Sequence, residues 1–112
     1  MEFVIDAPEE EVPFTAARFE SICLIANEAI SNAIRHAEAT HVRVQAEMMN
    51  DTLRIIVTDN GKGFDLDNGL DKAGLGLRNM HQRARLHNGG VDIDSTPGKG
   101  TIVTIEIPLR PM

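Results

Sequence analysis

The chain has 112 residues, a length that suits one domain with a modest core and is too short for two. Hydrophobic residues make up 42% of it and charged residues 25%, the usage of a folded globular protein, which excludes a disordered or fibrous chain. The net charge of −6 gives the surface a negative field, which would repel the phosphate backbone of a nucleic acid. We therefore expect no nucleic-acid partner. A nucleotide site would have to consist of a few local groups rather than of a general basic patch.

The single cysteine, Cys23, excludes an internal disulfide, and its apolar neighbours predict an inert buried thiol. Nowhere do 18 apolar residues follow one another, and the first residues lack a basic segment followed by an apolar run. We expect a soluble fragment that makes no direct contact with a membrane.

The first part of the chain predicts a strand and a long helix. Residues Glu2–Asp6 are typical of a short strand. An apolar period of 3.6 residues then runs from about Pro13 to about Ala37. The stripe that we expect this helix to bury consists of Phe19, Ile22, Cys23, Ala26, Ile30, Ala33, Ile34 and Ala37.

The middle of the chain predicts a hairpin and a loop. Apolar residues alternate in 42–48 and again in 53–57, with a turn at Asn50-Asp51 between them, so two antiparallel strands are expected. Residues 60–73 have three glycines and five Asp or Asn residues without apolar periodicity, which predicts a mobile loop.

The last part predicts a second helix and a closing hairpin. The helix is expected to begin near Gly76 and to end at Asn88-Gly89-Gly90. Strands over 91–95 and 101–107 are joined by a turn that contains Pro97 and two glycines. Strands linked by hairpins, with helices between the pairs, favour an α+β, two-layer sandwich whose mixed, mostly antiparallel sheet has its helices on one face.

The long helix has a polar face with possible chemistry. Glu28, Asn32 and Arg35 are spaced i, i+4, i+7, so they are predicted to share one face, opposite the apolar stripe. A carboxylate beside an amide oxygen suits Mg²⁺, which takes its other ligands from water and phosphates. Arg35 and His36 would then face the phosphates. A solvated face with a Glu–Arg pair fits the same pattern.

A second motif, Asp59-Asn60-Gly61-Lys62-Gly63, lies where a predicted strand ends. A carboxylate there can accept a hydrogen bond from an exocyclic amine, and glycines let the backbone approach a flat base. An ordinary tight turn has the same composition.

A third motif, Gly74-Leu75-Gly76-Leu77, precedes the second helix. Free N–H groups and the positive end of a helix dipole favour an anion at that position, although ordinary loops also contain Gly-x-Gly. The Walker pattern and the dinucleotide glycine pattern are both absent from the sequence, which excludes a P-loop or Rossmann site.

Taken in order, the three motifs resemble the ATPases of the GHKL, or Bergerat-fold, family. Residues 27–37 resemble the N box of that family, 59–63 its first glycine box and 74–77 its second. Residues 97–101 resemble its last turn and strand, so that the resemblance covers the chain from the first helix to Pro108.

The resemblance implies that Glu28 is the catalytic residue and that ATP and Mg²⁺ are bound by Asn32, Arg35, His36, Asp59, Gly61, Gly63, Gly74, Leu75, Gly76, Leu77 and Thr101. In this set Asn32 would ligate Mg²⁺, and Glu28 would orient or deprotonate an attacking group. Asp59 would read the adenine amino group, with Thr101 nearby. The glycines at 61 and 63 would make room for the base, and 74–77 would hold the phosphates beneath a lid of roughly 65–73.

In having Glu at position 28 and a short lid, the chain resembles the nitrate-sensor and desaturase-sensor type of histidine kinase. None of the four histidines has the context of the phosphoacceptor in that family. The resemblance therefore implies a catalytic domain, residues 1–112, that phosphorylates separate dimerisation and phosphoacceptor helices in cis or in trans. A response regulator would then receive the phosphoryl group. The expected location is the cytoplasm, as part of a membrane-bound sensor.

Two alternatives remain open. An anti-sigma-factor serine kinase uses similar boxes on a free-standing small domain. A non-catalytic module that binds ATP only to regulate its contacts would retain the same ligands.

Overall fold

The computed structural model describes residues 2–6, 16–63 and 76–108. Its elements in chain order are β1 (Glu2–Asp6), α1 (Ala16–Arg35), β2 (His41–Met49), β3 (Thr52–Asp59), α2 (Leu77–Arg85), β4 (Gly90–Ser95) and β5 (Thr101–Pro108). Both helices and all five strands lie where the sequence predicts them, with ends that differ by a few residues. The first three residues of the expected long helix, 13–15, lie outside the described residues.

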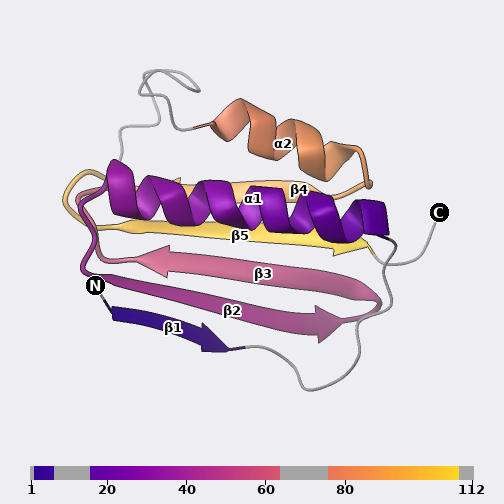
Figure 1. The fold of residues 1–112 in the computed structure, drawn as a ribbon, viewed down its shortest axis with the longest axis horizontal. Helices are drawn as coiled ribbons and strands as arrows, with labels where there is room; N and C mark the ends of the chain where they lie inside the picture. The colour runs from indigo at the N-terminus through magenta and orange to yellow at the C-terminus, as the bar shows by residue number, and fades with distance from the viewer. Residues whose placement is uncertain (1, 7–15, 64–75, 109–112) are drawn as a thin grey trace.

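The five strands form one sheet in the order β1-β2-β3-β5-β4. β1 pairs with β2 in parallel, and the other three pairs are antiparallel. Both helices lie on the same side of this sheet, with α1 over its middle and α2 beside α1, over β4 and β5 (Figure 1). The predicted two-layer α+β fold is confirmed.

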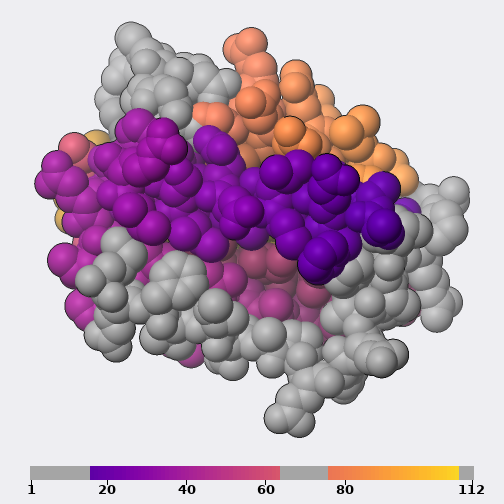
Figure 2. Space-filling view, in the orientation of Figure 1, coloured from indigo at the N-terminus to yellow at the C-terminus, as the bar shows by residue number. Residues whose placement is uncertain are grey.

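The core lies between the sheet and the two helices. Alternate residues of β3 and β5 point into it, as the strict alternation of buried and half-exposed positions shows. Its most deeply buried large side chains are Ile25, Met80, Ile105, Ile107, Val42 and Val57. α1 and α2 pack side by side, and their solvent-facing sides together form one helical surface (Figure 2).

The predicted buried stripe of α1 is wrong in part. Phe19 and Ile34 are 53% and 48% exposed, whereas Ile25 and Ala29, which were not expected, are buried. The apolar surface of α1 is wider than the strip that the sheet covers, and periodicity alone does not decide which part faces the sheet. Cys23, at the uncovered side, is only partly buried, so the expected buried thiol is also corrected.

A left-handed residue follows each helix, three positions after its last residue. After α1, Asn32 O accepts hydrogen bonds of 3.0 Å from both His36 N and Ala37 N, and Glu38 has a φ of 55°. After α2, Gly89 N donates to Ala84 O at 2.8 Å and Asn88 has a φ of 61°, which confirms the predicted stop. Neither helix is long and apolar enough to cross a membrane, within the residues that the structure describes.

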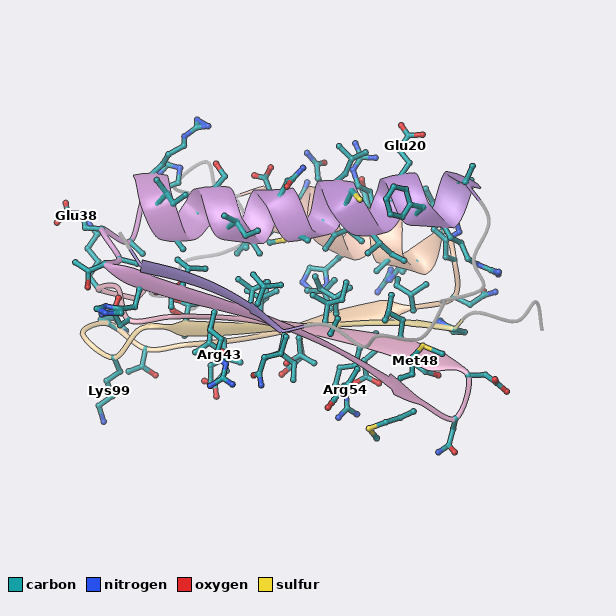
Figure 3. All side chains as sticks on the ribbon, turned by 60° about the horizontal axis from the view of Figure 1, so that its bottom comes forward. Glu20, Glu38, Arg43, Met48, Arg54 and Lys99 are labelled. Atoms are coloured by element: carbon teal, nitrogen blue, oxygen red, sulfur yellow. The ribbon has the colours of Figure 1, made fainter. Side chains whose placement is uncertain are left out.

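The sheet face away from the helices is polar. Arg54 lies between Glu47 and Glu106, its partners in register on the two neighbouring strands, with N···O distances of 3.3 and 3.8 Å. Arg43, Arg54 and Lys99 all project to this side (Figure 3). Two cavities, of about 420 and 340 Å³, are lined largely by residues of this face, including Thr104 and Glu106 in the first and Thr58 and Ile102 in the second.

Candidate nucleotide site

The described residues of three predicted motifs lie at one end of the molecule, on the helix side of the sheet. The last turns of α1, the end of β3 and the start of α2 all lie there (Figure 1). Asp59 and Thr101 are direct partners across β3 and β5. The second of the two cavities is lined in part by Asp59 and Thr101, but neither cavity includes Glu28, Asn32 or Gly76 from the helices.

Asp59 ends β3 with its side chain on the core side, 9% exposed. Its Oδ1 accepts a hydrogen bond of 2.7 Å from Gly61 N. Burial raises the pKa of the Asp59 carboxyl, while hydrogen bonds from the backbone N–H groups of Gly61 and Thr101 act in the opposite direction. A buried carboxylate held by backbone donors is a fixed acceptor, as recognition of an amine requires.

Thr101 lies beside Asp59 and is 4% exposed. Its Oγ1 is 2.8 Å from Ser95 Oγ, across the β4–β5 pair, and Ser95 Oγ also donates to Gly100 O at 3.4 Å. These contacts hold the Thr101 hydroxyl in one place at the edge of the core.

The two glycines of the first glycine motif are required by the protein itself. A Cβ on Gly61 would lie 2.5 Å from both the Cβ and the O atom of Ala37. Gly63 has a φ of +72°, and a Cβ there would collide with Thr96 O. The sequence suggests that these glycines make room for a base, whereas in the structure their close neighbours are backbone atoms and the Ala37 side chain.

Gly76 is the N-cap of α2, with a φ of 67° and no side-chain cap. A Cβ on Gly76 would collide with the carboxylate of Glu28. The half-buried Glu28 therefore lies against the first turn of α2, where backbone N–H groups and the helix dipole favour negative charge. Leu77, the next residue, is buried and anchors the start of the helix in the core.

The remaining residues of the polar face of α1 do not behave alike. Asn32 is 5% exposed, so it does not lie opposite the buried side of α1 as predicted. It is three residues after Ala29 and seven after Ile25, a spacing that returns to the same side of a helix. Arg35 is exposed and donates to Ser31 Oγ at 3.4 Å, and His36 is half-exposed.

The side chains near Asn32 fit a magnesium ion better than a metal held by protein alone. Within 2–6, 16–63 and 76–108, no three His, Cys, Asp or Glu side chains gather as a metal site. Mg²⁺ commonly takes one or two oxygen ligands from protein and the rest from water and phosphates. The oxygens of Asn32 and Glu28 are of that kind.

Part of the predicted site lies outside the described residues, namely Gly74, Leu75 and the expected lid, 65–73. The sequence predicts a mobile loop from residue 60 onward, but hydrogen bonds hold the first residues of that loop, 60–62, against the segment after α1. Lys62 N donates to Ala37 O at 2.8 Å, and the side chain of Asn60 bonds to Thr40. Sequence reasoning did not single out Asn60 or Ser95, and only the Asp-Asn-Gly run pointed to the former.

Residues 18–111 match the family model described as "Histidine kinase-, DNA gyrase B-, and HSP90-like ATPase". The chain belongs to this family. It is 44% identical over 88 residues to an uncharacterized sensor-like histidine kinase of Chloroflexus aurantiacus, a match that covers 74% of this chain and 15% of that protein. It is 38% identical over 104 residues to the signal transduction histidine-protein kinase/phosphatase DegS of Bacillus subtilis, covering 90% and 27%.

Solved structures agree with this assignment. The blue-light activated histidine kinase of Erythrobacter litoralis EL346 superimposes with a TM-score of 0.81 at 27% identity, over 96% of this chain and 35% of that one. The ATP binding domain of PrrB from Mycobacterium tuberculosis gives 0.69 at 28% identity, over 82% and 69%. The chain is thus an ATPase module of the kind found in sensor histidine kinases, and it spans about a quarter or less of the two curated relatives named above.

Proposed function

We propose that this chain binds Mg²⁺-ATP and donates the γ-phosphoryl group to a histidine on a separate dimerisation and phosphoacceptor domain. The observation that carries the proposal is the contact between Glu28 and the α2 N-terminus at Gly76. It brings a carboxylate that can act on an attacking group to a helix end that can hold phosphates.

The base end of the proposed site is Asp59, with Thr101 beside it. Ionised Asp59 accepts hydrogen bonds from the backbone N–H groups of Gly61 and Thr101, and its remaining acceptor capacity is available for the amino group of adenine. Guanine carries an oxygen at the corresponding ring position, which would face the carboxylate without a proton to share. Adenine selectivity is therefore expected from this residue.

At the phosphate end, Gly76 and Leu77 would bind the phosphates. Gly74 and Leu75, which lie outside the described residues, are predicted to bind them as well. Asn32 would ligate Mg²⁺, and Arg35 and His36 would face the phosphates. The ion neutralises charge on the phosphates when bound. The protein contributes positioning and charge stabilisation, which account for most catalysis of phosphoryl transfer.

The acceptor is proposed to lie in further domains of the same kinase. Phosphotransfer would occur in cis or between the subunits of a dimer, with a response regulator as the next acceptor. In this proposal the module lies in the cytoplasm, as part of a membrane-bound sensor. The relatives named above are sensor histidine kinases, and they favour this function over a serine kinase of the anti-sigma type.

The decisive experiment has two parts. Calorimetric titration of the chain with ATP, ADP and GTP, with and without Mg²⁺, should give adenine-selective binding that Mg²⁺ strengthens. The full-length kinase with radiolabelled ATP should then form an acid-labile, alkali-stable phosphoryl group, as phosphohistidine does. Binding without base selectivity would remove the role of Asp59, and acid-stable labelling would favour a serine kinase.

A further inference from the structure

We infer that Asn60 is a positioning residue for recognition of the base, because its side-chain amide fastens the strand end that carries Asp59 to the segment that follows α1. The inference rests on the proposed function, since it concerns how the base end of that site is held in place.

The Asn60 amide bonds to two consecutive backbone N–H groups. Its Oδ1 accepts hydrogen bonds from Thr40 N at 3.0 Å and from His41 N at 2.9 Å. Two donors that converge on one atom identify it as the oxygen and fix the orientation of the amide. The Nδ2 atom then donates to Thr40 Oγ1 at 2.9 Å, and it lies 3.2 Å from His41 Nδ1.

The residues next to Asn60 are joined to the same segment. Asn60 N donates to His41 O at 3.3 Å, and Lys62 N donates to Ala37 O at 2.8 Å. Gly61, between them, is packed so closely on Ala37 that a Cβ would not fit. Residues 60–62 and 37–41 therefore form one unit, in which the Asn60 side chain makes the side-chain hydrogen bonds between the two segments.

This unit controls the carboxylate of Asp59. Asp59 Oδ1 is bound by Gly61 N, so the direction of the carboxylate depends on where the peptide between 60 and 61 lies. If the Asn60 side-chain bonds are lost, residues 60–62 keep only their two backbone bonds to His41 O and Ala37 O, so the peptide can shift and change the direction of the Asp59 acceptor. The phosphate end is built from Glu28 and the start of α2, which the hydrogen bonds of Asn60 do not reach.

The test compares ligands that use different ends of the site. In the 112-residue chain, Asn60→Ala should weaken ATP binding about fivefold, since the misdirected Asp59 carboxylate loses one net hydrogen bond to the base, which contributes about 1 kcal/mol, and 1.4 kcal/mol is a factor of ten. Binding of inorganic tripolyphosphate, which has no base, should not change. Both affinities are measured by calorimetry, with Gln82→Ala, an exposed amide on α2, as the matched control.

Rescue by a conservative variant separates positioning from general loosening. Asn60→Asp keeps an oxygen for both backbone N–H groups, and the Thr40 hydroxyl can turn to donate to the other oxygen. It should therefore restore most of the ATP affinity. If Asn60→Ala does not fold, Asn60→Ser, whose shorter side chain cannot span both donors, takes its place against Asn60→Asp.

Three results would overturn the inference: unchanged ATP affinity in Asn60→Ala, an equal loss for ATP and tripolyphosphate, or no rescue by Asn60→Asp. Failure of the proposed function looks different. In that case the unmodified chain itself would not distinguish ATP from GTP.

Discussion

Asp59 combines two properties that usually oppose each other, burial and negative charge. Its carboxylate is held by the backbone N–H groups of Gly61 and Thr101, which offset part of the desolvation. A ligand that donates a hydrogen bond to the remaining acceptor positions would offset more of the cost of burying this charge. The residue is therefore expected to affect stability and binding in different ways.

The binding prediction concerns Asp59→Asn. The amide presents a donor where adenine also presents one, so we expect ATP affinity to fall by about 10-fold or more, because a mispaired buried polar group costs about 1–3 kcal/mol. Calorimetric titration with ATP measures the loss. ATP affinity equal to that of the unmodified chain would remove Asp59 from the base end.

The same variant tests the raised pKa of Asp59. A carboxyl whose pKa is raised by folding stabilises the fold while it is protonated, and this contribution is lost as the pH rises through the folded-state pKa. The free energy of unfolding of the unmodified chain, relative to Asp59→Asn, should therefore fall as the pH rises from below the ordinary aspartate value, and become constant above the raised value. Urea unfolding at a series of pH values measures it, and a difference that rises with pH would contradict the sign.

At the scale of single residues, the sequence indicates candidate side chains but not the contacts that hold them in place. Asp59 and Gly61 were chosen from a short motif, since charge and backbone freedom are local properties. The collision of a Gly61 Cβ with Ala37 and the clamp by Asn60 depend on segments about 20 residues apart. No local pattern encodes such contacts.

The elements themselves were predictable because periodicity and turn residues are local. The parallel pairing of β1 with β2 and the position of β5 between β3 and β4 were not, since they depend on long-range pairing. The rotation of α1 about its axis was also missed. Ile25 and Phe19 are equally suitable for burial by sequence, and only the position of the sheet decides between them.

Gly76 shows how one backbone position joins two elements. Gly76→Ala should destabilise the fold by roughly 1–2 kcal/mol through its left-handed φ alone, and by more through the collision with Glu28. Urea unfolding gives the loss. The matched control is Gly98→Ala, where φ is +84° but a Cβ would meet nothing, so it should show the conformational part alone. Equal losses in the two variants would mean that Glu28 is not confined there.

The other end of α2 is held to α1 by a hydrogen bond between His87 Nε2 and Ser21 Oγ, at 2.9 Å. Ser21→Ala should lower the free energy of unfolding by about 1 kcal/mol. The control is Ser31→Ala, the same change in the same helix, where the serine accepts a 3.4 Å bond from the exposed Arg35. Thermal and urea unfolding of both variants compare the two sites, and equal effects would show that the bond contributes little.

For the whole molecule, ligand binding and stability are linked. A ligand that binds only the folded chain stabilises it by about 2.7 kcal/mol at 100 times its Kd. Mg²⁺-ATP should therefore raise the melting temperature more than ATP with a chelator, and GTP should raise it least. Differential scanning fluorimetry with an external dye suits a chain without Trp or Tyr. Equal shifts with ATP and GTP would contradict a base-selective site.

The pairing of Asp59 with Thr101 also has a consequence for the order in which a nucleotide would leave. β3 and β5 each have a hydrogen-bonded strand on both sides, so their amides can exchange with solvent only when the middle of the sheet opens. The separation of α2 exposes only three buried side chains, Leu77, Met80 and Ala84, so we expect it to cost less free energy than opening the middle of the sheet. The contacts with the phosphates would therefore break more often than the contacts with the base. A bound nucleotide would release its phosphates first and its adenine last.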